Sequence, residues 1–205
     1  MEIQDRKFTT IFFTAIIGFL FAFSSCNGKT GSIHSQVIKT KNQLVMTELD
    51  TLKNQFNHFK KFVIEGGVEE AKVFFDFPIK SDDLWYKVLD DEAVEKQLGN
   101  LFNEKDFEIY FDNIFNKSFK ECLSDIDVQQ LFDSGKFSSK FVTSRENGYL
   151  VKNQIEATYS NSELRLIFNS IIQNQSNEFE ADHTEIYTFV IIGNRLKFSA
   201  FYMAG

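Results

Sequence analysis

Between residues 42 and 65, apolar side chains recur at alternating spacings of three and four, which is the period of an amphipathic helix. Most of the positions between them are polar or charged, so the pattern predicts a helix that packs its apolar stripe on its own domain. Gly66 and Gly67 follow, and glycine is typical of the residues that end helices. The stripe consists of Val45, Leu49, Leu52, Phe56, Phe59 and Val63.

The middle of the chain predicts several shorter helices. Pro78 disfavours helical geometry at the residue before it, so residues 74–79 are predicted to be extended. Ser81, Asp82 and Asp83 are typical of a helix start and predict a short helix near Trp85. The other predicted helical segments are 91–102, 107–123 and 125–132.

After Gly135 the pattern changes to alternating segments rich in β-branched and aromatic residues, which predict strands. Gly193-Asn194 predicts a two-residue hairpin turn, because glycine accepts a positive φ at the first turn position. Asn161-Ser162 predicts a second turn, and residues 175–182 are predicted to be a polar loop. The predicted strands are 149–159, 163–173, 184–192 and 195–203.

Helices followed by an antiparallel meander predict an α+β fold, with N-terminal helices packed on a curved C-terminal sheet of about four strands. In the closing hairpin, the alternation predicts that Leu196, Phe198, Ala200 and Tyr202 share one face. We expect Ile186 and Val190, together with Leu196 and Phe198, to help form the main core.

The closing hairpin, residues 187–198, the N-terminal helix and Phe77-Pro78-Ile79 together resemble the NTF2-like α+β cone. This resemblance would cover residues 42–205, and it implies a cavity between the sheet and the helices. Some domains of this kind are enzymes, and many only bind ligands, so the resemblance does not decide between these functions.

The first 25 residues have the layout of a secretory signal peptide, with two basic residues before an apolar run over 11–23 and two serines just before Cys26. Phe23-Ser24-Ser25-Cys26 resembles the lipobox of bacterial lipoproteins. The resemblance implies that residues 1–25 are removed and that Cys26 carries a lipid. The alternatives are an ordinary cleaved signal and an uncleaved anchor, although the run is shorter than the roughly 20 residues that a spanning helix needs.

Residues 26–41 are predicted to form a flexible tether, because they are polar and show no apolar period. Asn27 occupies the place where lipoproteins kept in the inner membrane carry an acidic residue. The lipoprotein resemblance therefore implies an anchor in the outer membrane, facing the periplasm. Residues 42–205 are predicted to be a single domain.

Charge limits the choice of partners. Residues 1–25 carry two acidic and two basic side chains, so the mature chain keeps the formal net charge of −7. An acidic protein has no electrostatic reason to bind nucleic acid, and we expect none as a partner. The expected partners are the membrane, through the lipid on Cys26, and either a basic protein or a small ligand.

The cysteine and phenylalanine content of the chain predicts features of its interior. Cys122 is the only cysteine besides Cys26, so a lipidated chain has no internal disulfide, and we interpret Cys122 as a small core residue. The chain has 25 Phe and one Pro. This composition predicts an aromatic core, and an aromatic-lined cavity is the alternative.

Candidate chemistry is sparse. His34, His58 and His183 lack the spacing of metal ligands, and there is no phosphate-binding, dinucleotide or nucleophile-elbow motif, so we expect no metal and no cofactor. An acid–base site would combine His183 with Asp182 or Glu185. Adjacent strand residues face opposite sides, so Asp182 and His183 do not form a dyad by themselves. The competing interpretation of His183 is a solvated loop residue.

The acidic pair Asp82-Asp83 beside Trp85 is interpreted as the polar start of a helix, and in a functional role it would receive a basic partner. The candidate pocket or partner contacts are therefore Asp82, Asp83, Trp85 and His183. We expect a lipid-anchored envelope protein that binds a protein or small ligand without catalysis, and an inhibitor or immunity role is one form of this. The alternatives are an enzyme that uses an NTF2-like cavity and a structural or assembly lipoprotein.

Overall fold

The computed structural model describes residues 33–146, 148–174, 176 and 178–204. The chain divides into two compact units, residues 1–39 and 40–205, and only residues 33–39 of the first unit are described. The predicted signal peptide, Cys26 and the first part of the predicted tether lie outside the described residues. In the part of the chain that is described, no helix is both long and apolar enough to span a bilayer.

Helix α1 (Ile33–Glu65) begins before the predicted start at residue 42, so residues 33–41 are helical where a tether was predicted. The reason is that no Gly or Pro occurs between residues 33 and 65, and nothing in this stretch interrupts helical hydrogen bonding. Gly66, with φ of 76°, follows the helix as predicted. The predicted stripe is confirmed where side chains are described, because Leu52, Phe56, Phe59 and Val63 are buried.

Short helices follow α1, and two of the predicted helices differ from those in the structure. The predicted helix 107–123 is two helices, because Oδ1 of Asn116 accepts a hydrogen bond from the Phe119 N–H at 2.9 Å and starts a new one. In the predicted helix 91–102 only the first turn is helical, and Phe102 instead pairs with Ile79 in a β-bridge. The helical elements are α2 (Val68–Ala71), η1 (Lys72–Phe74), α3 (Asp82–Val88), α4 (Asp91–Val94), α5 (Glu104–Ile114), α6 (Lys117–Ser124) and α7 (Val128–Ser134).

The sheet is antiparallel, as predicted, but it has six strands where about four were expected. Two short edge strands, which pair with β3, were missed because they are too short and polar to show an alternating pattern. The strand β5 begins at Phe179, inside the predicted loop. Its first part is exposed and polar, so the sequence there resembled a loop. The strands are β1 (Lys136–Ser138), β2 (Val142–Glu146), β3 (Tyr149–Ser160), β4 (Glu163–Gln173), β5 (Phe179–Ile192) and β6 (Arg195–Ala204).

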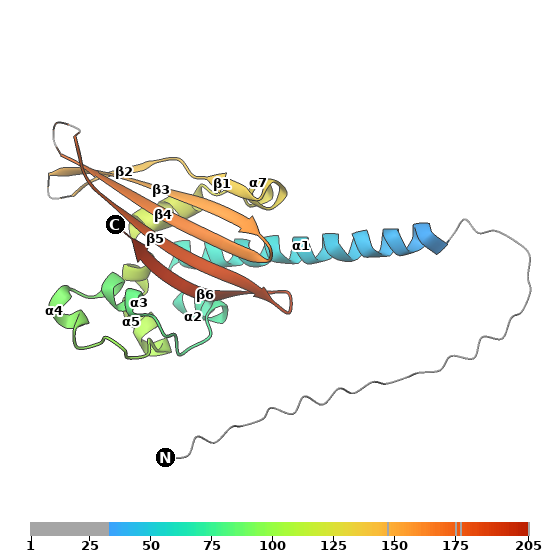
Figure 1. The fold of residues 1–205 in the computed structure, drawn as a ribbon, viewed down its shortest axis with the longest axis horizontal. Coiled ribbons are helices and arrows are strands. Elements are labelled where there is room, and N and C mark those ends of the chain that lie inside the picture. Colours follow the sequence, from blue (N-terminus) through green and yellow to red (C-terminus); the bar gives the residue numbers. More distant parts are fainter. Residues whose placement is uncertain (1–32, 147, 175, 177, 205) are drawn as a thin grey trace, which may run out of the picture. The chain divides into compact units, whose positions relative to one another are not determined.

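The helices of the second unit cover one face of the long strands β3 to β6, and the core lies between these two layers (Figure 1). Aromatic rings fill much of this layer, and Phe59 of α1 meets Phe74, Phe115 and Phe189 edge-on. The phenylalanine content therefore builds a packed aromatic core. Cys122 is fully buried in the same core, as predicted.

The closing hairpin has the predicted Gly193-Asn194 turn, with φ of 56° and 59° at the two residues. Leu196 and Phe198 are buried, as expected. The expectation for Ile186 and Val190 is wrong, because the core face of β5 carries the buried Glu185, Tyr187 and Phe189 instead.

In β6 the predicted shared face ends at Phe198. Phe198 pairs with Phe189 and Ala200 pairs with Thr188, so Ser199 is an extra residue in a bulge. The bulge moves Ala200 and Tyr202 off the core face and places Phe201 in the core.

Candidate functional site

A groove of about 460 Å³ lies between the start of α6 and the helix-facing side of β3, β4 and β5. This volume is in the range of pockets that hold small ligands. One part of its wall is apolar and the rest is polar, so it suits a molecule with two chemically different ends. The lining residues are Asn116, Lys117 and Ser118 at the start of α6, Val151 and Asn153 of β3, Phe168, Ser170 and Ile172 of β4, and His183 and Glu185 of β5.

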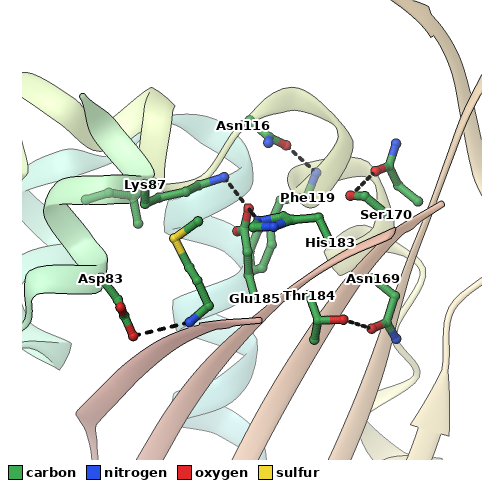
Figure 2. Close-up of polar contacts among 12 residues, drawn as sticks. Asp83, Lys87, Asn116, Phe119, Asn169, Ser170, His183, Thr184 and Glu185 are labelled. Carbon is green, nitrogen blue, oxygen red and sulfur yellow. Dashed lines mark hydrogen bonds and ion pairs between the residues drawn. The ribbon is translucent and has the colours of Figure 1, made fainter. Parts of the chain in front are cut away.

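A buried ion pair lies at the polar end of the groove (Figure 2). The Glu185 side chain is 3% exposed and the Lys87 side chain of α3 is 9% exposed, and Lys87 Nζ lies 2.6 Å from Glu185 Oε1. Removing two charges from water is costly, so such a pair persists only when both charges are well paired. The short distance and the further partners of Glu185 meet that condition.

Two neighbours on β5 complete the surroundings of Glu185. His183 and Tyr187 are two residues away on either side, so the alternation of the strand places all three side chains on one face. The Tyr187 hydroxyl is 2.8 Å from Glu185 Oε2 and 2.7 Å from the carbonyl oxygen of Ile114, and it shares its one proton between these acceptors. His183 Nε2 is 3.2 Å from Glu185 Oε1.

These contacts fix the protonation of the cluster. Burial alone would raise the pKa of Glu185, but the His183 contact, the charge and hydrogen bond of Lys87 and the Tyr187 hydroxyl together hold it below its ordinary value. Burial, followed by the charge of Glu185, raises the pKa of Tyr187 well above its ordinary value. At neutral pH Glu185 is therefore an anion with both oxygens engaged, and Tyr187 is a neutral donor.

A second polar pair lies across the sheet from His183. Ser170 is the cross-strand partner of both Asn153 on β3 and His183 on β5. Its hydroxyl donates to Asn153 Oδ1 at 2.7 Å. Asn153 is 3% exposed, and its amide nitrogen has no hydrogen-bond partner among the described residues. This nitrogen is therefore a free donor that is accessible from the groove.

Helix α6 begins at the rim of the same groove. Asn116 caps it, and its first turn contains no acidic residue. The first N–H groups of a helix and the aligned peptide dipoles give this end a partial positive charge. Lys117 follows the cap directly and lines the groove, whereas Glu121, which pairs with it at 3.8 Å, is not among the lining residues, so the α6 side of the groove is positive.

The candidate contact residues that the sequence analysis selected lie in two different places. Asp82 Oδ1 accepts from the Gly99 N–H at 2.8 Å, and Asp83 Oδ2 accepts from the Met203 N–H on the edge of β6 at 3.3 Å. Trp85 is buried and its Nε1 donates to the carbonyl of Asn100 at 3.0 Å. These three residues hold α3 to its surroundings, and Asp82 and Asp83 also line a separate hollow of about 330 Å³ beside β6, whereas His183 lines the groove.

Sequence reasoning considered Glu185 as a partner of His183, and the structure brings these two together. It missed Lys87, Tyr187, Asn153 and Ser170. The signal for Tyr187 was available, because positions 183, 185 and 187 of a strand must share a face. Lys87 is 98 positions from Glu185 in sequence, and no local pattern indicates that contact.

In the described part of the chain, no group of three or more His, Cys, Asp or Glu side chains is placed to hold a metal ion. Comparison of the chain with protein-family models, with curated proteins and with solved structures finds no match.

Proposed function

We propose that the protein is a lipid-anchored envelope protein whose folded domain binds a small ligand in the groove between α6 and the sheet. The groove carries this proposal, because an apolar wall and a polar end meet there in a space of about 460 Å³. We also propose that helices, groove and sheet belong to an NTF2-like cone. In that fold a ligand lies between the two layers.

The state of Glu185 supports binding without catalysis. Both of its oxygens are engaged by Lys87, Tyr187 and His183, and its pKa is lowered, so it is a weak base. Its role is to keep Lys87 and His183 in fixed positions. Such a fixed polar end binds a ligand without the entropic cost of ordering loose side chains.

Full-chain protein extracted from its membrane tests the binding proposal by native mass spectrometry. The wild type should carry a small-molecule adduct. Ser170→Phe fills the groove and should remove the adduct, whereas Thr184→Phe, on the other face of the sheet, should retain it at an unchanged melting temperature. Loss in both variants, or no adduct in the wild type, contradicts the proposal.

The lipid anchor rests on the sequence around Cys26. The intact mass of the membrane-fraction protein should lack residues 1–25 and include acyl chains on Cys26. Cys26→Ala should release the domain from the membrane, because the lipid is the proposed attachment. Recovery of Met1 on the mature protein contradicts this part of the proposal.

One observation favours a second candidate function, proton transfer catalysis by His183. Its Nε2 lies 3.2 Å from Glu185, and a carboxylate that holds one ring nitrogen leaves the other for a substrate. His183→Ala decides between the two functions. Loss of a measured turnover in a variant with an unchanged melting temperature selects the enzyme.

A further inference from the structure

We infer that the ligand of the groove is a small organic acid, whose carboxylate lies at Asn153 and whose apolar body lies against Phe168 and Ile172. This inference rests on the proposed function and names its ligand class. It follows from which polar groups of the groove are free and from the sign of their charge.

The free polar groups of the groove are mainly donors. Asn153 is 3% exposed, and its Oδ1 is occupied by Ser170, so the amide nitrogen is the group left to the groove. This nitrogen is accessible from the groove, so a ligand acceptor can bond to it, and a hydrogen bond is electrostatically stronger in such a largely desolvated place than in water. Among the described residues that line the groove, Glu185 is the one carboxylate, and it already accepts from three neighbours, so it offers little to a cationic ligand.

The charges around these donors favour an anion. Lys87 neutralises Glu185 at 2.6 Å, so the buried cluster contributes little net charge. Lys117 and the start of α6, whose first turn has no acidic residue, add positive potential at the rim. An anionic group is therefore attracted locally, although the whole chain has a net charge of −7.

The apolar wall defines the rest of the ligand. The groove beside the polar end is lined by Val151, Phe168 and Ile172. A small inorganic anion would leave this apolar surface exposed to water. A short alkyl or aryl body removes it from water at roughly 25 cal/mol per Å². The chemistry is therefore that of an amphiphilic monocarboxylate, either a free acid or the C-terminus of a peptide with an apolar last residue.

Calorimetric titration of the detergent-solubilised full chain with three probes of similar length and different charge tests the inference. Hexanoate should bind at least about tenfold more tightly than hexanamide or hexylammonium, because hydrogen bonds to a charged group are stronger than neutral ones. Acetyl-Ala-Leu with a free carboxylate separates the two sources. Tighter binding of this peptide than of hexanoate identifies a peptide end, and the reverse order identifies a free acid.

Two isosteric variants place the carboxylate. Asn153→Asp keeps the acceptor for Ser170 and replaces the free amide by a negative oxygen, so hexanoate affinity should fall about tenfold or more. Asn169→Asp makes the same change on β4 but on the opposite face, beside Thr184 (Figure 2), and should change the affinity less than about twofold. If Asn153→Asp does not fold, Lys117→Glu at the exposed rim replaces it as the test variant. Lys117→Glu should weaken hexanoate binding about threefold or more.

The outcomes separate this inference from the proposed function. Equal affinity for hexanoate and hexanamide overturns the acid class and leaves small-ligand binding in place. Equal weakening by Asn153→Asp and Asn169→Asp overturns the location in the groove. Failure of all three probes to bind overturns the inference, and the adduct of the membrane-extracted protein decides the proposed function on its own.

Discussion

Removing Lys87 tests the buried charge cluster most sharply. Lys87→Met keeps an unbranched apolar stem and removes the charge that faces Glu185 at 2.6 Å. Glu185 is 3% exposed, so water does not replace the lost partner. Breaking a buried pair by removing one partner costs about 3–5 kcal/mol, and Glu185 keeps Tyr187 and His183, so we expect about 3 kcal/mol.

The cost should depend on pH. In the wild type the pKa of Glu185 is lowered, so its contribution to stability is present above the ordinary value of 4.5 and is lost as the pH falls through the lower folded value. Without Lys87, burial has less opposition and raises the pKa. The variant then relieves its unpaired charge by protonation, so the gap to the wild type should narrow between about pH 7 and pH 4.

Urea unfolding followed by circular dichroism at both pH values measures this gap. Lys53→Met is the matched control, because Lys53 pairs at 3.0 Å with Asp133, whose side chain is 53% exposed and can rehydrate. The control should lose less than about 1 kcal/mol. A Lys87→Met cost below about 1 kcal/mol at pH 7, or a gap that does not narrow at pH 4, refutes the reasoning.

Two further predictions concern the core. Burial raises the pKa of the Cys122 thiol, so iodoacetamide should label it only after denaturation, and rapid labelling of the native protein contradicts its burial. Phe198→Ala should lower the free energy of unfolding by about 3–5 kcal/mol, because its ring packs against Phe75 and Phe189. Ile192→Ala, at a side chain that is 60% exposed, should change it by less than about 0.5 kcal/mol, and equal effects of the two variants contradict the assigned faces.

The parts of the fold that local periodicity defines were predictable from the sequence. The stripe from Leu52 to Val63 follows from a repeating apolar spacing, and the Gly193-Asn194 turn follows from a two-residue turn signal. The α+β class followed from the order of these patterns. The break at Asn116 was also readable, because an N-cap residue interrupts an otherwise continuous apolar spacing, but the apolar spacing was given more weight.

The candidate site was largely beyond prediction for a physical reason. Alternation assigns the more hydrophobic face of a strand to the core, and on β5 this rule selected Ile186 and Val190. The true core face carries Glu185, which is stabilised there by Lys87 from a helix that is distant in sequence. A buried charge breaks the pattern, and such exceptions concentrate at functional sites.

Whether the groove is the ligand site is tested most directly by a crystal structure of the full chain soaked with hexanoate. The account predicts electron density for the acid between α6 and the sheet, with its chain on Phe168 and Ile172 and its carboxylate within hydrogen-bond reach of Asn153. Density for hexanoate only at other surfaces, or a groove that holds no hexanoate at saturating concentration, would contradict the account.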